Sequence, residues 1–206
     1  MNIVTISREF GSGGRELGRA IAEILGYDYY DREIISTIAE RNNMDENYIE
    51  HALSTNFWQT FPLSFRHSFI SPIEIHAPQV NLLLDQKHVV EEIAKKGKNC
   101  VIVGRNADVL LRDYNPLKLF VCADMQTKIQ RCKDRADQSE AMFSDKEFKR
   151  KIQRIDKNRA RTRYVLADGE WGHRQSYSLI IDTSKWEIPE LAKSVADFVK
   201  RYFKDE

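Results

Sequence analysis

A cluster of small residues near the amino terminus has the composition of a phosphate-binding loop. The stretch FGSGGRELG, residues 10–18, lies between an apolar run and a helical pattern. At the start of a helix, exposed backbone N–H groups and the helix dipole attract an anion, and glycines let a phosphate approach closely. Neither common glycine signature fits completely, because Glu16 replaces a required glycine in one, while the other lacks its lysine and its hydroxyl. The spacing alone leaves two alternatives open: a phosphate loop and a tight structural turn.

A basic segment late in the chain is the second candidate for chemistry. Residues 149–163 hold eight lysines or arginines and one acid, Asp156. Apolar residues begin a helical stripe that Arg159 continues: Phe148, Ile152 and Ile155. Asp156, Arg159 and Arg163 share one side of this predicted helix, where the acid can orient the cations. A solvated basic helix remains an alternative, and so does an RNA-binding helix, although no aromatic residues are interleaved with the charges.

The elements that must position these residues follow from apolar runs. Four short runs bounded by turn residues or charges predict buried strands at residues 2–6, 100–104, 117–123 and 177–182. Three stripes at helical spacing predict helices between or after them: Ala20, Ile21, Ile24 and Leu25; Val89, Val90 and Ile93; Leu191, Val195, Phe198 and Tyr202. This alternation predicts an α/β fold, with a parallel sheet and helices on both faces. Residues 54–84 break the rhythm and predict an irregular insertion or a helical subdomain.

The bulk composition limits the class of protein. A chain of 206 residues suits one domain, residues 1–206, and 31% of these residues are charged. No apolar run approaches the roughly 18 residues of a membrane helix, and the first residues lack a signal-peptide pattern. We therefore expect a soluble, cytoplasmic protein that binds neither membrane nor, with a net charge of +1, nucleic acid. Three cysteines without metal or redox spacing predict buried structural thiols: Cys100, Cys122 and Cys132.

Three blocks of sequence together resemble the cytidylate kinase-like proteins, a divergent branch of the P-loop nucleoside monophosphate kinases. The blocks are SREFGSGGRELGRAIAEILGYDYYDREII, VIVGRNADVLL and IDKNRARTRY, and the resemblance spans residues 3 to about 200. It implies a three-layer P-loop fold with an acceptor-binding insertion at about 31–84 and a helical lid at 138–168. It also implies ATP- and Mg²⁺-dependent phosphoryl transfer to a nucleoside monophosphate, CMP or dCMP. A homo-oligomer is compatible with this expectation.

The resemblance assigns the glycine cluster to the nucleotide phosphates and identifies what it lacks. The implied phosphate contacts are Gly11, Ser12, Gly13, Gly14, Arg15 and Glu16. Gly14 stands where the family's lysine would be, and Glu16 stands where its threonine would be. We expect Arg8 and Arg15 jointly to supply the missing positive charge. The alternative is a pair of solvated arginines, one of which pairs with Glu9 or Glu16.

Acceptor-side residues come from other parts of the chain. Asp31 matches an aspartate at the end of the second strand, where it would contact the acceptor and, through water, Mg²⁺; capping of the following helix is the alternative. Arg105 follows a buried strand and matches an acceptor-binding arginine, with Asn106 and Asp108 as supports. The residues after Asp31 depart from the family pattern, so the identity of the acceptor stays open.

The resemblance places the basic helix in a lid over the two nucleotides. Asp156 and Arg159 match an acid and an arginine that face them, and Arg163 lies one turn further on. Arg8, Arg15, Arg159 and Arg163 are therefore the expected catalytic residues. Residues 182–184 follow the last strand, where the donor base often lies. Loss of the lysine leaves open a nucleotide-binding sensor without turnover, and a kinase for a non-nucleotide acceptor.

Overall fold

Five parallel strands form one sheet in the part of the chain that the structure describes. The computed structural model describes residues 1–54, 78–138, 140, 142–167 and 170–204. In the described part the strand order is β2-β3-β1-β4-β5. The strands are β1 (Ile3–Arg8), β2 (Asp28–Tyr30), β3 (Cys100–Val103), β4 (Leu117–Cys122) and β5 (Leu179–Asp182). The four strands predicted from apolar runs are thus confirmed.

The central strand β1 fixes the place where a site can form. Ile6 of β1 is in register with Val103 of β3 on one side and with Leu119 of β4 on the other. Because all pairings are parallel, the carboxyl ends of the strands meet at one edge of the sheet. The connections that follow these ends carry most of the residues expected to do chemistry.

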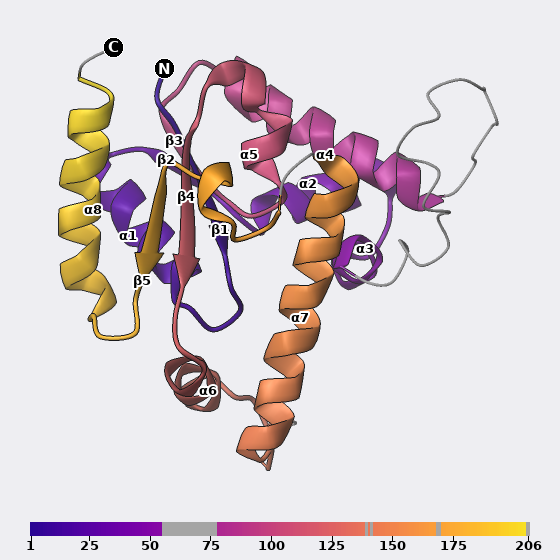
Figure 1. Ribbon diagram of the computed structural model, residues 1–206. Coiled ribbons are helices and arrows are strands. Elements are labelled where there is room, and N and C mark those ends of the chain that lie inside the picture. Colours follow the sequence, from indigo (N-terminus) through magenta and orange to yellow (C-terminus); the bar gives the residue numbers. More distant parts are fainter. Residues whose placement is uncertain (55–77, 139, 141, 168–169, 205–206) are drawn as a thin grey trace.

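Helices cover both faces of the sheet, as predicted (Figure 1). Helices α1 (Gly14–Leu25) and α8 (Ile188–Tyr202) pack together on one face. The other face carries α2 (Glu33–Asn42), α4 (Pro78–Lys95) and the short α5 (Ala107–Leu110), with α3 (Glu46–Ser54) against α2 and α4. Helices α6 (Met125–Asp134) and α7 (Asp145–Leu166) follow β4, and single 3-10 turns occur at Arg112–Tyr114 and Arg174–Ser176. No helix of the described residues has the length and apolar character that crossing a membrane requires.

The buried faces of the helices differ in part from the predicted stripes. Ile21 is fully buried, whereas Ile24 on the same predicted stripe is 42% exposed. In α8 the buried residues are Ile188, Leu191, Ala192, Val195, Ala196 and Val199, while Phe198 and Tyr202 are partly exposed. The four-residue spacing from Leu191 to Val199 follows the contact line with α1. The predicted stripe was therefore right at its start and wrong at its end.

Helix α7 is held beside the sheet edge by a small apolar cluster. A capping box formed by Ser144 and Glu147 begins the helix. Phe148 and Ile152 of α7 are buried against Ile129 of α6, as their helical spacing predicts. Phe10, from the connection after β1, packs against the same cluster. The basic helix is thus attached to the glycine-rich segment.

The predicted insertion is only partly within the described residues. Of residues 54–84, those from 55 to 77 lie outside the described part. Residues 78–84 form the beginning of helix α4, so this portion is regular. The expected lid region is represented by α7.

Candidate functional site

The connection from β1 to α1 has the geometry of an anion-binding loop. Gly11 and Gly13 have φ values of 79° and 78°, in the left-handed region that favours glycine. Helix α1 begins at Gly14, so its first N–H groups have no partner within the helix. A cavity of about 240 Å³ lies over this loop. Its lining comprises Arg8, Glu9, Phe10, Gly11, Gly13, Gly14, Arg15, Arg131, Cys132, Arg135, Glu140, Lys151 and Arg159.

Two arginines contact one buried carboxylate at this edge of the sheet, and two more lie within electrostatic range of it. Asp31 is only 4% exposed, and its Oδ2 forms an ion pair with Arg15. Nη2 of Arg8 lies 3.6 Å from the Oδ1 atom of Asp31. Arg105 and Arg159 are close enough to interact electrostatically with the same carboxylate. The structure thus brings together residues from four separate parts of the sequence.

Three acids face these four arginines, because Glu50 lies beside Arg105 and Asp156 beside Arg159 in addition to Asp31, so a small excess of positive charge remains. Burial lowers the pKa of Arg8, and repulsion from Arg159, Arg105 and Arg15 lowers it further, against the attraction of Asp31. Burial is also the main cause of lowered pKa values at Arg105 and Arg159. Each shift means that the charged form is electrostatically disfavoured. An anion bound among them would relieve this repulsion.

Arg105 keeps hydrogen-bonding capacity for a ligand. Its side chain is 12% exposed, and its nearest acid is Glu50, with 3.7 Å between Nη2 and Oε1. The buried Nε atom of Arg105 has no hydrogen-bond partner. Gln86 fixes the backbone here, because its Nε2 donates to the carbonyl oxygen of Arg105 at 3.1 Å. A planar guanidinium in this state is suited to a phosphate or carboxylate.

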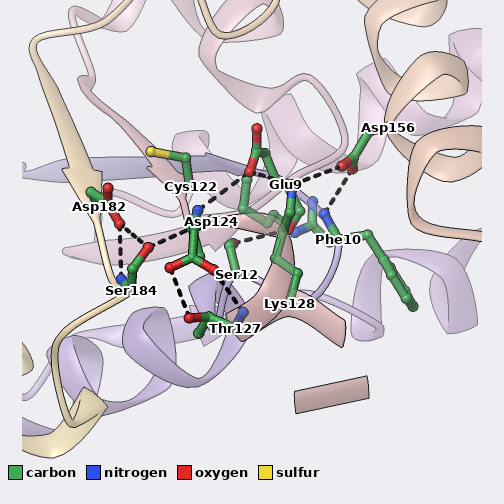
Figure 2. Close-up of polar contacts among 12 residues, drawn as sticks. Glu9, Phe10, Ser12, Cys122, Asp124, Thr127, Lys128, Asp156, Asp182 and Ser184 are labelled. Carbon is green, nitrogen blue, oxygen red and sulfur yellow. Dashed lines mark hydrogen bonds and ion pairs between the residues drawn. The ribbon is translucent and has the colours of Figure 1, made fainter. Parts of the chain in front are cut away.

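Asp156 connects α7 to the glycine loop (Figure 2). Its Oδ1 accepts a hydrogen bond from the backbone N–H of Phe10 at 2.7 Å and lies 3.3 Å from Nη1 of Arg159. Lys128 is 3.9 Å from the second carboxylate oxygen and donates to Oε2 of Glu9 at 2.8 Å. Burial raises the pKa of Asp156 to about 6, although the Phe10 N–H, Arg159 and Lys128 oppose the shift. Asp156 therefore holds the loop in place and orients Arg159.

The two lid arginines occupy different environments. Nη1 of Arg159 donates to the carbonyl oxygen of Arg8 at 2.9 Å, and the side chain lines the cavity. Arg163 instead forms a buried ion pair with Asp108, below the ring of Tyr177. One further helical turn carries Arg163 beyond the loop to α5. The structure therefore does not bring Arg163 to the cavity, and it pairs Asp108 with Arg163 rather than with the expected Arg105.

Glu9 and Glu16 pair with cations at α6. Glu9 pairs with Lys128 within the helix, and Glu16 forms an ion pair with Arg135 directly after it. The alternative in which Arg8 or Arg15 pairs with one of these glutamates is therefore wrong, because both arginines face Asp31.

Asp31 does not cap the helix that follows it. Arg32 is the N-cap of α2 and provides no side-chain cap, while the backbone N–H of Asp31 donates to Glu33 at 2.9 Å. The carboxylate is directed at the arginines instead. Among the described residues, no group of three or more His, Cys, Asp or Glu side chains could by itself hold a metal ion.

Helix α6 contributes cations that the sequence did not identify. Arg131 donates to the carbonyl oxygen of Ser12 at 3.1 Å and to Oγ1 of Thr183 at 2.8 Å. Thr183 itself donates to the Ser12 carbonyl at 2.7 Å. Beside it, Ser184 donates from its hydroxyl to Asp182 and accepts from the backbone N–H of Asp124 (Figure 2). The end of β5 is thus fastened to the glycine loop.

The cysteines agree only partly with the expectation of buried thiols. Cys100 is buried, but Cys122 and Cys132 are half-buried. Cys132 lines the cavity, because it lies on the face of α6 that meets Gly11.

Comparison of the sequence with protein-family models places the chain in a family. The sequence model of the cytidylate kinase-like family matches residues 3–185, which include all four arginines and Asp31. The chain belongs to the cytidylate kinase-like family. The resemblance seen in its sequence is therefore confirmed. A search of curated protein sequences found no significant match.

Solved structures share the fold of this cytidylate kinase-like chain. An uncharacterized protein from Eubacterium ventriosum matches with a TM-score of 0.70 at 20% identity, over 97% of this chain and 99% of that one. Shikimate kinase from Bacteroides thetaiotaomicron matches with a TM-score of 0.57 at 14% identity, over 97% of this chain and 98% of that one. Shikimate kinase from Acinetobacter baumannii, in complex with shikimate, matches with a TM-score of 0.53 at 14% identity, over 98% of this chain and 93% of that one. At these identities the likeness establishes the P-loop kinase fold and nothing about the substrate.

Proposed function

We propose that the protein transfers the γ-phosphoryl group of Mg-ATP to a small phosphate-bearing acceptor, with CMP or dCMP as the simplest choice. The family and the fold support phosphoryl transfer in general. The observation that carries the proposal is the meeting of four arginines around Asp31, beside an open helix start. The phosphates of two substrates would neutralise this excess charge.

The proposed reaction needs positioning and charge neutralisation. An oxygen of the acceptor phosphate bonds to the γ-phosphorus while the bond to the β–γ bridging oxygen breaks, and ADP leaves. The N–H groups at the start of α1 bind the donor phosphates, and Arg105 binds the acceptor. Arg159 lies over the loop between them, where it stabilises charge on the transferring group. No covalent enzyme intermediate is required.

Magnesium fits this site chiefly through the nucleotide. Mg²⁺ in such sites usually binds one or two carboxylates together with substrate phosphates and keeps several waters. Oδ1 of Asp31 is buried without a hydrogen-bond partner, so it can accept a hydrogen bond from a metal-bound water. The ion would neutralise charge on the phosphates when bound. Glu16, at the position of the family's threonine, is engaged by Arg135.

The same orphaned oxygen favours a second candidate acceptor, a hydroxyl-bearing acid. Asp31 Oδ1 could accept the proton of an attacking hydroxyl group, while Arg105 binds the acid. Two of the solved structures with this fold are named as shikimate kinases. The two candidates differ in whether Asp31 has to take up a proton.

Acceptor-dependent ADP formation tests the proposal. Purified protein with Mg-ATP would be assayed against CMP, dCMP, UMP, AMP, GMP, shikimate and no acceptor, with Arg105→Ala alongside. We expect turnover with one of these acceptors, and a large rise in its KM in Arg105→Ala. Nucleotide binding without turnover anywhere on the panel would contradict a kinase for these acceptors and favour a nucleotide sensor.

A further inference from the structure

The side chain of Arg8 runs along the sheet edge between two glycines. An ideal Cβ atom added at Gly14 would lie 2.6 Å from Cβ and 3.1 Å from Cγ of Arg8. At the other end, a Cβ atom added at Gly104 would overlap Nη1 of Arg8 and lie 2.7 Å from its Cζ. The stem of Arg8 therefore packs on Gly14, and its guanidinium packs on Gly104.

The contact between Arg8 and Gly14 leaves no space for a side chain at position 14. Gly14 is the position of the lysine in related loops, yet any side chain there would begin in the space of the Arg8 stem. Val121 limits the other side, since its Cβ would be 3.2 Å from the added atom. Close-packed interiors do not absorb such overlaps without a shift of the backbone. A lysine at position 14 is therefore incompatible with this close approach of the helix start to the end of β1, where the Arg8 stem begins.

Contact with Gly104 determines the position of the Arg8 guanidinium group. Gly104 follows β3 with a φ of 78°, and it leaves room for the guanidinium at the carboxyl edge. There Nη2 of Arg8 is 3.6 Å from Asp31, and Arg105 is near enough to repel it. The charge thus lies between the donor loop and the acceptor-side arginine.

We propose that Arg8 is a relocated phosphoryl-binding cation and that Gly104 is its positioning residue. Arg8 would supply the charge of the missing lysine from the strand instead of from the loop, and contact the γ-phosphoryl group. Arg15 has a different role, because its side chain is 49% exposed whereas that of Arg8 is 13% exposed. This inference rests on the proposed function and deepens it, by assigning the phosphoryl contact to one residue.

A double-mutant cycle between positions 8 and 104 tests the inference. The variants are Arg8→Ala, Gly104→Ala and the double variant, measured for acceptor-dependent kcat and for the Kd of Mg-ATP. We expect Arg8→Ala to lower kcat by about 10³-fold, in the range of other transition-state arginines. Gly104→Ala should lower it by at least about tenfold. The double variant should be no worse than Arg8→Ala, because Gly104 acts only through Arg8.

Gly97→Ala is the matched control. Gly97 has a φ of 71°, but an added Cβ atom there would meet nothing within 4 Å. The backbone strain is similar and the guanidinium is untouched, so kcat should stay within about twofold of the wild type. The proposal would be overturned if the kcat losses of Arg8→Ala and Gly104→Ala multiplied in the double variant. It would also be overturned if Gly104→Ala were as active as Gly97→Ala.

Two further measurements apply where a variant does not fold or where the wild type shows no turnover. Should Gly104→Ala fail to fold, Arg8→Lys is compared with Arg8→Gln; at least tenfold more turnover in Arg8→Lys is expected, and equal losses would overturn the role of the charge. Should the wild type show no turnover with any acceptor, the proposed function fails. The cycle is then read from the Kd of inorganic tripolyphosphate, where non-additive losses support Arg8 as a phosphate contact and additive or absent losses refute it.

Discussion

Arg159 is the residue where the lid helix and the glycine loop meet. Its guanidinium donates to the Arg8 carbonyl, lies beside Asp156 and lines the cavity. The sequence indicates this residue because a cation continues the apolar stripe of Phe148 and Ile152. An arginine on a face that otherwise packs inward needs a partner, and here it has the loop.

Replacement of Arg159 should separate catalysis from binding. We expect Arg159→Ala to lower kcat by about a hundredfold or more, whereas the Kd of Mg-ATP should change by only a few-fold because the loop N–H groups remain. Lys157→Ala, an exposed position of the same helix, is the control and should behave like the wild type. Steady-state kinetics and calorimetry give both quantities. Wild-type turnover in Arg159→Ala would remove this residue from the mechanism.

Asp156 should make stability depend on pH below neutrality. Its folded pKa of about 6 is higher than that of an unfolded aspartate, so the folded protein binds the proton more tightly. Its stabilising contribution is complete below about pH 4 and is lost as the pH rises through about 6, by at most about 3 kcal/mol. The free energy of unfolding in urea, taken as wild type minus Asp156→Asn, should therefore fall as the pH rises over this range. A difference that is constant with pH would argue against a raised pKa.

Several residues of the site could not be identified from the sequence around them. Lys128 and Arg131 look like ordinary surface cations of a helix. Lys128 is buried and Arg131 half-buried, and their hydrogen-bond partners Glu9 and Ser12 are more than a hundred positions away. No local pattern in the sequence records such pairings.

Helix α7 shows how one element serves both stability and the site. Its first half is attached by Phe148 and Ile152, its middle by Asp156 and Arg159 at the loop, and its end by Arg163 at α5. The helix is therefore docked on the loop in the structure, with Arg159 already at the cavity. The spacing of Arg163 predicts the correct side of the helix but not which neighbour it would meet.

The ion pair at the end of α7 should matter for folding rather than for turnover. Asp108→Asn leaves the buried guanidinium of Arg163 without its counter-charge, and we expect a loss of about 3–5 kcal/mol in the free energy of unfolding. Replacing both residues, as Asp108→Leu with Arg163→Met, should recover much of this loss. Urea denaturation measures the stability, and kcat measured well below the melting temperature should remain within a few-fold. A large loss of kcat with unchanged stability would restore Arg163 to the catalytic group.

Apolar runs predicted four strands of the described sheet, including β5, which is only partly buried. Strands β1, β3 and β4 are apolar runs buried on both faces, which the sequence shows directly. Strand β2 has only three residues, all half-buried, so its place was known through the family resemblance alone. Positions at the margin of a helix–helix contact, such as Ile24 and Phe198, depend on crossing geometry that periodicity does not contain.

At the scale of the whole molecule, the parallel sheet explains why the site is where it is. Strand ends that are far apart in sequence converge at one edge, so Arg8, Asp31 and Arg105 become neighbours. Alternation of strands and helices was enough to predict this edge. The individual pairings around it, and the space that Gly14 leaves for Arg8, required the structure.

The most direct test of the arginine centre is the fate of the γ-phosphoryl group itself. ATP labelled at the γ-phosphate, with Mg²⁺ and each acceptor of the panel, would be followed until the label is found on the acceptor, on water or still on ATP. We predict label on one acceptor with the wild type, and at least about a hundredfold slower transfer with Arg105→Ala at low acceptor concentration. Label that stays on ATP, or that appears only as inorganic phosphate whatever the acceptor, would contradict a phosphoryl-transfer centre for these acceptors.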